Sequence, residues 1–249
     1  MNKILVIGDS CTDIYTYCKS FRLAPDKPVP ILEIVKVKEN PGMACNVFCN
    51  AASLVGKDVD IVTNDNYTEV KKNRYVDRSS NHMFFRVDSS VKIDRINSLE
   101  DVSFDYDTVI ISDYDKGFLA ESDIEYICEE HPRVFLDTKK VLGPWARAAT
   151  YIKINNREYE RSKDFIDDHL KNKIIQTLGS KGCLYRGDVY PTKSIETIDL
   201  SGAGDTFLAC LAISYTKHKD IKKAIEFGNR CATKVCKKKG TSIIIGEKY

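Results

Sequence analysis

The chain has little of what marks a protein that binds nucleic acid, membranes or metal clusters. Its formal net charge is only +2 over 249 residues, so it carries no general attraction for polyanions. No apolar run approaches the length of a membrane span. The four histidines stand apart along the chain, which gives no support for a histidine-based catalytic triad. We therefore expect no nucleic-acid or membrane partner, and the short run Lys237–Lys239 is typical of a solvated helix end.

Cysteine is present, but not in a pattern that binds zinc or forms a disulfide framework. There are nine cysteines, an odd number, with no Cys-x-x-Cys pair and no matching cysteine–histidine spacing. Free thiols in the cytosol fit this usage best. The segment 1–8 has the pattern of a β-strand and differs from a signal peptide. These features predict a cytoplasmic protein.

Apolar residues make up 43% of the chain, enough for a full core, and we expect a single domain over residues 1–249. Strand-length apolar runs occupy residues 3–7, 60–63, 108–112, 133–137, 151–154 and 174–177. Helical periodicity occupies residues 44–55, 122–130 and 206–215. The alternation predicts an α/β fold with a mostly parallel central sheet and helices on both faces.

Polar side chains gather where the predicted strands end, which is where parallel sheets bind ligands. Four strand ends carry such pairs: Asp9 and Asp13, Asp113 and Lys116, Asp137 and Lys139, and Asn155 and Glu158. Any one pair is explained equally well by an ordinary loop. Four successive pairs indicate a binding site along that edge.

Two extended stretches depart from this rhythm and predict a small β-flap. They lie at residues 29–38, after three prolines, and at residues 83–87. We place the flap strands within about residues 12–40 and 74–91. Such a flap either covers a pocket or pairs with a second copy of the chain. Pairing is an option because apolar residues fall on both faces of residues 29–37, so one face can be buried in a dimer. A homodimer through these strands is therefore one expectation.

The segment 198–207 contains the most informative local pattern, Gly202-Ala203-Gly204-Asp205 before an apolar helix. Glycines let the main chain approach an anion closely, and the first amides of a helix lack internal partners. A carboxylate beside such an anion cradle is suited to remove a proton from a hydroxyl that attacks phosphorus. Helix capping alone also explains an aspartate at this position.

Together with other blocks, this pattern resembles the PfkB, or ribokinase-like, family of sugar kinases. It is similar above all to the branch that phosphorylates heptose 7-phosphate, the kinase half of a bifunctional enzyme of the bacterial ADP-heptose pathway. The blocks occur in order at residues 8–13, 22–30, 41–47, 112–117, 137–139, 155–158, 202–205 and 239–242. The block Arg-Leu-Ala-Pro-Asp-Lys-Pro-Val-Pro at residues 22–30 is similar to the Arg-Ile-Ser-Pro-Glu-Ala-Pro-Val-Pro that is specific to that branch. The resemblance implies a ribokinase-like three-layer fold with a β-lid.

The resemblance also implies catalytic and cofactor roles. Asp205 would be the base, and the amides of Gly202, Ala203 and Gly204 would neutralise charge on the transferred phosphoryl group. Glu158, with Asn155, would hold Mg²⁺ on the phosphates of ATP through water. The residues expected to line the nucleotide are Asn155, Thr177, Gly179, Gly182, Asn229 and Gly240.

On the acceptor side, the resemblance implies that Asp9, Asp13 and Asn46 bind sugar hydroxyls, with Gly42 and Asp113 beside them. Four cations are candidates for the distal phosphate of the substrate: Arg22, Lys27, Arg86 and Lys116. Ordinary ion pairs on the flap explain the presence of Arg86 and Lys27 as well as phosphate binding does. Thr241 and Ser242, in the last matched block, are also explained as residues that terminate a helix.

The chain also departs from the family pattern. Met43 replaces the second of two paired glycines, and the loop and helix usual after residues 61–62 are missing. No His-x-Gly-His of a nucleotidyltransferase half is present. We expect an ATP- and Mg²⁺-dependent kinase acting on the anomeric hydroxyl of a heptose 7-phosphate. The alternatives are a kinase for another sugar, sugar phosphate or nucleoside, and a non-catalytic homologue that binds sugar or nucleotide.

Overall fold

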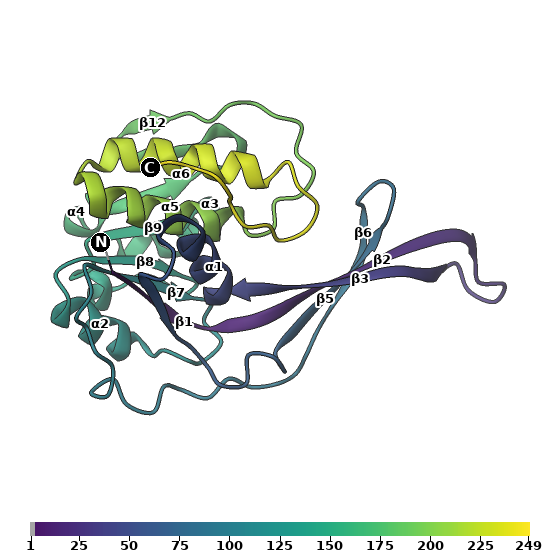
Figure 1. Ribbon diagram of the computed structural model, residues 1–249, viewed down its shortest axis with the longest axis horizontal. Coiled ribbons are helices and arrows are strands. Elements are labelled where there is room, and N and C mark those ends of the chain that lie inside the picture. Colours follow the sequence, from purple (N-terminus) through teal and green to yellow (C-terminus); the bar gives the residue numbers. More distant parts are fainter. Residues whose placement is uncertain (1–2) are drawn as a thin grey trace.

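The structure is a computed structural model that describes residues 3–249. An eight-stranded sheet forms its centre, with the strand order β12-β11-β10-β9-β8-β7-β1-β4 (Figure 1). Its strands are β1 (Ile4–Gly8), β4 (Val59–Val62), β7 (Thr108–Asp113), β8 (Val134–Thr138), β9 (Tyr151–Asn155), β10 (Ile174–Thr177), β11 (Cys183–Tyr185) and β12 (Asp188–Tyr190). The six neighbouring strands β4, β1, β7, β8, β9 and β10 run parallel to one another. Strands β11 and β12 are antiparallel additions at the β10 edge.

Helices cover both faces of this sheet, because its strands alternate apolar side chains between two cores. In β1, Ile4 and Val6 pack with the helices α1 (Ala44–Val55), α5 (Ala203–His218) and α6 (Ile221–Val235). Leu5 and Ile7 face the other core, with α2 (Glu121–Glu130) and the short turn η1 (Pro144–Ala146). The shorter elements α3 (Asn156–Ser162), η2 (Lys163–Phe165), α4 (Asp168–Lys171) and η3 (Gly179–Lys181) follow β9 and β10. The predicted α/β class with a mostly parallel sheet is confirmed.

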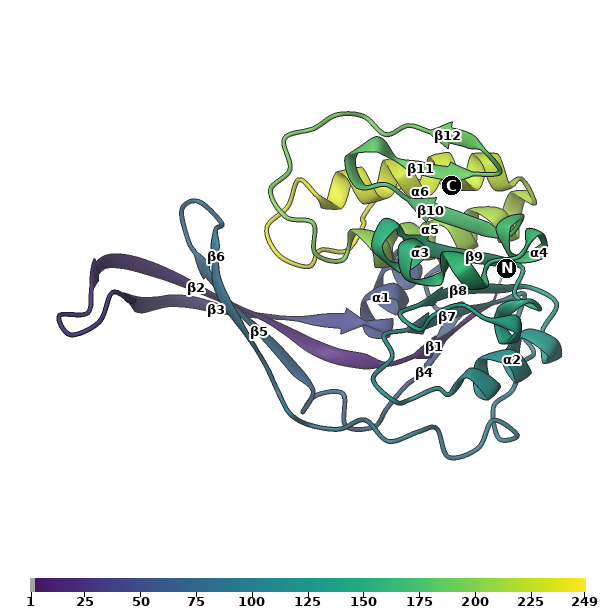
Figure 2. The same ribbon diagram turned by 180° about the vertical axis from the view of Figure 1, so that it is seen from behind.

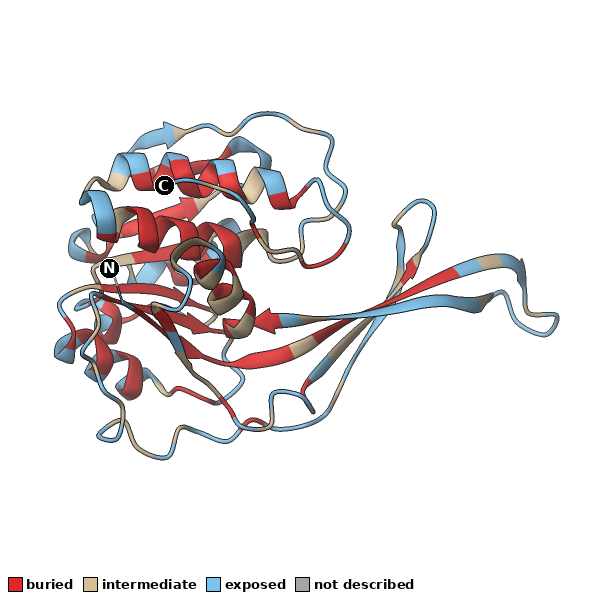
Figure 3. Cartoon of the chain, in the orientation of Figure 1, coloured by how far each residue is buried: buried red, intermediate tan, exposed pale blue. Residues whose placement is uncertain are grey.

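Four strands form a second sheet that projects away from the body (Figures 1 and 2). Its order is β3-β2-β5-β6, from β2 (Ser10–Leu23), β3 (Pro30–Met43), β5 (Lys71–Asp77) and β6 (Met83–Asp88). We call these strands the lid. Burial is confined to the half of the β2–β3 hairpin beside the body, and the far half is exposed (Figure 3).

Most predicted boundaries are accurate to within a few residues, but several elements were not expected. The helix α1 matches its predicted range, whereas α5 begins three residues before the predicted 206 and so includes Asp205 in its first turn. The elements α6, β11 and β12 were missed, and the predicted lid range of about 74–91 includes only the second half of β5. The helix α6 buries one narrow face among many charged residues, and β11 and β12 are three residues each, too short for a clear alternation. Within residues 3–249, no helix combines the length and apolarity needed to cross a bilayer.

Candidate active site

The turn before α5 positions the candidate base. Gly202 caps the helix in the left-handed conformation, with φ of 79°, and a Cβ there would lie 2.7 Å from the Asn46 side-chain nitrogen. Both constraints favour glycine. Asp205 follows in the first helical turn and is only 5% exposed. The turn therefore places a buried carboxylate at the start of a helix, where the partial positive charge of the helix dipole favours a negative group.

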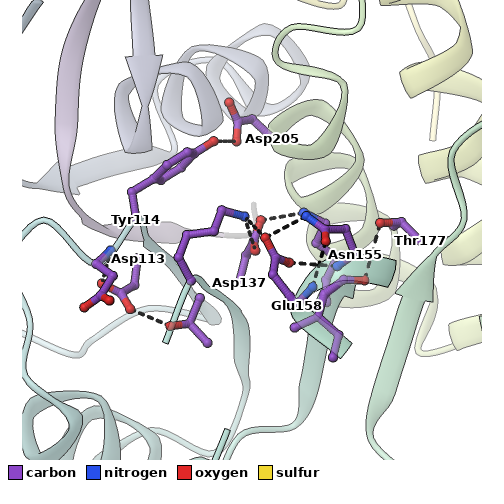
Figure 4. A network of polar contacts seen from close by, with 12 residues as sticks. Asp113, Tyr114, Asp137, Asn155, Glu158, Thr177 and Asp205 are labelled. Atoms are coloured by element: carbon purple, nitrogen blue, oxygen red, sulfur yellow. Dashed lines mark hydrogen bonds and ion pairs between the residues drawn. The ribbon is translucent and has the colours of Figure 1, made fainter. Parts of the chain in front are cut away.

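Two side chains from distant parts of the chain hold the Asp205 carboxylate, and Figure 4 shows one of them, Tyr114. The Tyr114 hydroxyl donates to Oδ1 at 2.6 Å, and the Asn46 amide donates to Oδ2 at 2.9 Å. Burial raises the pKa of Asp205, and these two donors act in the opposite direction. An aspartate whose pKa is raised in this way is a better proton acceptor than one in water.

Asn46 is itself fixed by a second asparagine. The Asn50 amide donates to the Asn46 side-chain oxygen at 3.1 Å, and the Asn50 oxygen accepts from Thr206 at 3.1 Å and from the Ile244 amide at 3.0 Å. This network joins α1, α5 and the C-terminal segment. Its consequence is that the Asn46 side chain presents its nitrogen, and only its nitrogen, to Asp205.

A chain of alternating charges lies beside Asp205. Buried Lys153 contacts Asp137 at 2.6 Å, and Lys139 contacts Asp137 at 3.4 Å and Glu158 at 2.6 Å. Lys153 also lies under the helix start, since a Cβ on Gly204 would be 3.0 Å from its ammonium nitrogen. Burial acts to lower the pKa of Lys139, but Asp137 and Glu158 outweigh it and raise that pKa. The ammonium groups of Lys139 and Lys153 therefore lie, each paired with a carboxylate, at the expected phosphoryl end of the site.

Asn155 and Glu158 form a capping box at the start of α3. The Asn155 oxygen accepts from the Glu158 amide at 3.0 Å, and Glu158 accepts from the Asn155 backbone and side chain, both at 2.7 Å. Among residues 3–249, no group of three histidine, cysteine or carboxylate side chains could hold a metal ion. The donors still suit Mg²⁺, which keeps most of its waters and takes few protein ligands. The Glu158 carboxylate already faces one cation, the Lys139 ammonium.

Asp9 and Asp113 hold the loop after β7 in place by accepting hydrogen bonds. Asp9 accepts from the Tyr114 amide at 2.6 Å and from the Phe118 amide at 3.2 Å. Burial, with the nearby charge of Asp113, raises the pKa of Asp9 to about 6. Asp113 accepts from Thr138 at 2.5 Å and from Lys140 at 3.2 Å. In the structure both residues fix the loop that carries Tyr114, and their predicted place at the sugar stays a prediction.

Asp13 lies where the lid meets the body. It accepts from Arg74 at 2.6 Å and from Thr241 at 3.1 Å. Gly42 packs directly against it, since a Cβ there would be 2.9 Å from the Asp13 carboxylate. Met43 has φ of 61°, a conformation that costs a non-glycine residue energy, and its sulfur lies 2.9 Å from the Lys72 ammonium. The replacement of the second family glycine by Met43 therefore places a strained, buried side chain beside the expected acceptor site.

The expected nucleotide residues are divided between two places. Thr177, at the end of β10, donates to the Ile154 carbonyl at 3.3 Å and lies beyond Asn155 (Figure 4). Gly179 begins η3, and a Cβ on Gly182 would lie 2.0 Å from the Tyr190 carbonyl. The Asn229 amide donates to the same carbonyl at 2.9 Å. Gly240 lies elsewhere, against the lid tyrosines, with φ of 74° and the Tyr17 hydroxyl 3.4 Å from its would-be Cβ.

The cations expected to bind a distal phosphate are dispersed. Arg22 lies at the exposed end of β2, and Lys27 lies between β2 and β3. The turn that joins these two strands projects far from the body (Figure 1). Arg86 is exposed and paired with Asp88 at 2.7 Å. Lys116 is exposed in the loop after β7. Within this chain, the structure does not bring these four residues together.

Sequence reasoning gave no role to several residues that the fold places at the site. Tyr114 was part of a matched block, but its contact with Asp205 spans 91 residues of sequence. Lys153 did carry a signal, because a lysine within a buried apolar strand requires a charged partner. Lys72 and Arg74 lie on β5, a strand that the apolar pattern did not reveal.

Comparisons with known proteins bear on this geometry. The sequence pattern of the family described as pfkB family carbohydrate kinase matches residues 132–247. The bifunctional protein HldE of Helicobacter pylori strain J99 is 30% identical over 299 residues, which cover 98% of this chain and 64% of that protein. The protein of the same name from a Nitratiruptor species is 29% identical, over 96% of this chain and 62% of its own length. The chain thus spans slightly less than two thirds of these curated relatives.

Solved structures share the fold at low sequence identity. Ribokinase from Thermotoga maritima gives a TM-score of 0.74 at 16% identity, covering 97% of this chain and 95% of its own. The nucleoside kinase of Methanocaldococcus jannaschii gives 0.69 at 19% identity, covering 97% and 93%. Residues 132–247 therefore carry the pattern of pfkB family carbohydrate kinases, and the chain as a whole has the ribokinase-like fold of these solved structures.

Proposed function

We propose that the chain transfers the γ-phosphoryl group of ATP to the anomeric hydroxyl of a sugar phosphate, D-glycero-D-manno-heptose 7-phosphate. The observation that carries the proposal is the buried Asp205 carboxylate at the start of α5, held by Tyr114 and Asn46. The choice of heptose rests on the sequence block at residues 22–30 and on the other seven matched blocks.

In the proposed reaction, the sugar hydroxyl approaches Asp205 and competes for the oxygen that Tyr114 occupies. As the hydroxyl oxygen bonds to the γ-phosphorus, its proton passes to the Asp205 carboxylate. The bond from that phosphorus to the bridging oxygen breaks, and ADP leaves with the electron pair. Asn46 keeps the carboxylate oriented throughout, because its own position is fixed by Asn50.

The negative charge of the transferred phosphoryl group would be stabilised by backbone amides and an ammonium group that are positioned before substrate binds. The amides of Gly202 and Gly204 at the helix start would face the transferred group, and the Lys153 ammonium lies beside Gly204, whereas the Ala203 amide already donates to the Leu200 carbonyl at 3.2 Å. When bound, Mg²⁺ would screen the phosphates of ATP. Glu158 and Asn155 are the residues that would hold its water shell.

The acceptor would lie against the lid, with Asp13 as its hydroxyl partner. Asp13 is oriented by Arg74 and Thr241 and has little freedom to turn away. Lys72 makes no ion pair with a carboxylate within residues 3–249 and lies beside Met43. Its free charge suits an acceptor that is itself anionic.

A coupled assay of ADP release tests the proposal directly. It compares heptose 7-phosphate, fructose 6-phosphate, ribose and adenosine at saturating ATP and Mg²⁺. Turnover highest with heptose 7-phosphate is the expected result. Turnover with another acceptor would replace the heptose, whereas ATP binding without turnover of any acceptor would show a non-catalytic homologue.

Two further features belong to this proposal. The far half of the lid exposes Phe21, Leu23 and Ile31, which favours a homodimer formed through the lid strands. Sedimentation velocity tests this, with a monomer at micromolar concentration as the contrary result. We place the reaction in the cytosol, since all nine cysteines are unpaired thiols.

A further inference from the structure

A basic cavity lies between the lid and the body, next to the expected acceptor site. Its volume is about 530 Å³. Six residues line it: Tyr17, Val35, Lys36, Lys38, Arg78 and Lys239. We call it the lid pocket. It joins β2, β3, the turn after β5 and the loop after α6, so residues far apart in sequence contribute to one hollow.

Strand register ties the lid pocket to Asp13. On β3, Lys38 pairs with Tyr15 and Lys36 pairs with Tyr17, two and four residues beyond Asp13 on β2. Side chains that pair across strands, and those two apart along a strand, share one face of a sheet. The two lysines therefore lie on the same lid face as Asp13. Two residues of strand span about 7 Å, so the lid pocket begins one short step from the acceptor site.

The four cations of the lid pocket have no anionic partner. Within residues 3–249, none of them forms an ion pair with a carboxylate. Two carboxylates on the adjoining segments are engaged by backbone amides. Asp199 accepts from Ser201 at 2.9 Å and Gly240 at 3.0 Å, and Asp77 accepts from the turn that follows it. Uncompensated like charges repel one another, so their gathering in one hollow indicates an anion.

One of these cations is already held in place. The Lys239 ammonium donates to the Arg78 carbonyl at 2.8 Å, which joins the body loop to the lid turn. Gly240, the next residue, packs against Tyr17 and Tyr15, and Tyr15 bonds Thr241 at 3.1 Å, which in turn bonds Asp13. The run Lys237–Lys239 is therefore more than a solvated helix end, since Lys239 forms a wall of the lid pocket.

We propose that the lid pocket binds the phosphate monoester of the acceptor, through Lys36, Lys38, Arg78 and Lys239. The proposal rests on the proposed function, a kinase for a sugar phosphate. It replaces Arg22, Lys27, Arg86 and Lys116 as the phosphate-binding set. A sugar whose anomeric end lies at Asp205 and whose ring contacts Asp13 would extend its phosphorylated end along the lid face into this hollow once the contact of Gly240 and Thr241 with Tyr15 opens.

The test measures equilibrium binding by calorimetry, so that it does not depend on turnover. The double variant Lys36→Ser/Lys38→Ser is titrated with heptose 7-phosphate, with the same heptose lacking phosphate, and with a non-hydrolysable ATP analogue. The Kd for heptose 7-phosphate should rise about tenfold or more, because two charge-assisted contacts are lost. The other two Kd values should stay within twofold. Lys57→Ser/Lys248→Ser removes two exposed lysines outside the lid pocket and should change none of the three.

Each other outcome has a definite meaning. An unchanged Kd for heptose 7-phosphate would overturn the proposal, and so would equal wild-type affinity for the phosphorylated and unphosphorylated sugar. A rise confined to the ATP analogue would assign the lid pocket to the nucleotide and would also overturn it. If wild type prefers another sugar phosphate, the same comparison is made with that sugar. Phosphate-dependent binding without turnover would leave the lid pocket standing while the kinase proposal fails.

Discussion

Replacing Tyr114 by phenylalanine removes one hydroxyl from the centre of the proposed site and nothing else. That hydroxyl donates to Asp205 at 2.6 Å and stabilises the charged carboxylate, thereby opposing the rise in pKa that burial causes. Without it, the pKa of Asp205 should rise further. The base then becomes protonated at a higher pH, and the acidic limb of the activity profile should move upward.

The magnitude follows from the kind of bond that is lost. A hydrogen bond to a charged group contributes about 1.5–3 kcal/mol, and about 1.4 kcal/mol corresponds to one pH unit. The acidic limb of kcat/KM for the acceptor should therefore move up by about one pH unit or more in Tyr114→Phe. The acceptor hydroxyl no longer has to displace the tyrosine, so the KM for the acceptor should not rise.

The assay is ADP release measured from pH 5 to 9 at saturating ATP. Tyr126→Phe, which removes a hydroxyl from an exposed tyrosine on α2, is the matched control and should leave the limb in place. A limb in Tyr114→Phe that stays where it is, or moves to lower pH, would refute the reasoning. A uniform loss of activity at every pH would indicate a structural role alone.

Three further predictions concern the same site. Asp205→Asn should lower turnover at least about a hundredfold while the Kd of ATP stays nearly unchanged; a near wild-type rate would remove Asp205 from the mechanism. Lys153→Met should lower the free energy of unfolding by about 3 kcal/mol in urea at pH 7, because it leaves the buried Asp137 short of one partner, and adding Asp137→Asn should restore part of the loss. An equal or larger loss in the double variant would show that the pair is not coupled. The folded-state pKa of Asp9 is about 6, above its ordinary value of 3.8, so between these two pH values the folded chain holds a proton there that the unfolded chain lacks. Lowering the pH from 7 to 5 should therefore stabilise wild type by about 1 kcal/mol relative to Asp9→Asn, and an equal pH dependence in both proteins would contradict this.

Local patterns were sufficient for much of the main sheet. The predicted range of α1 agrees with the structure, and the six predicted strands fall within a residue of those observed. Buried parallel strands are short apolar runs, which can be recognised without knowing their neighbours. The strand β5 was not recognised in the sequence as a separate strand. Its residues are only partly buried, and the charged residues Lys72 and Arg74 interrupt any apolar run.

The sequence by itself determined the α/β class, the turn at Gly202 that starts α5, and the presence of an acid in the first helical turn. Each depends on residues close together in the chain, where backbone preference and periodicity act directly. Only the tertiary structure decided what surrounds that acid. Tyr114, Asn46 and Lys153 reach the centre from three separate elements, and the cations of the lid pocket come from β3, a lid turn and the loop after α6. Hydrogen bonds and charge act over a few ångströms in space, and chain folding alone sets which residues lie within that range.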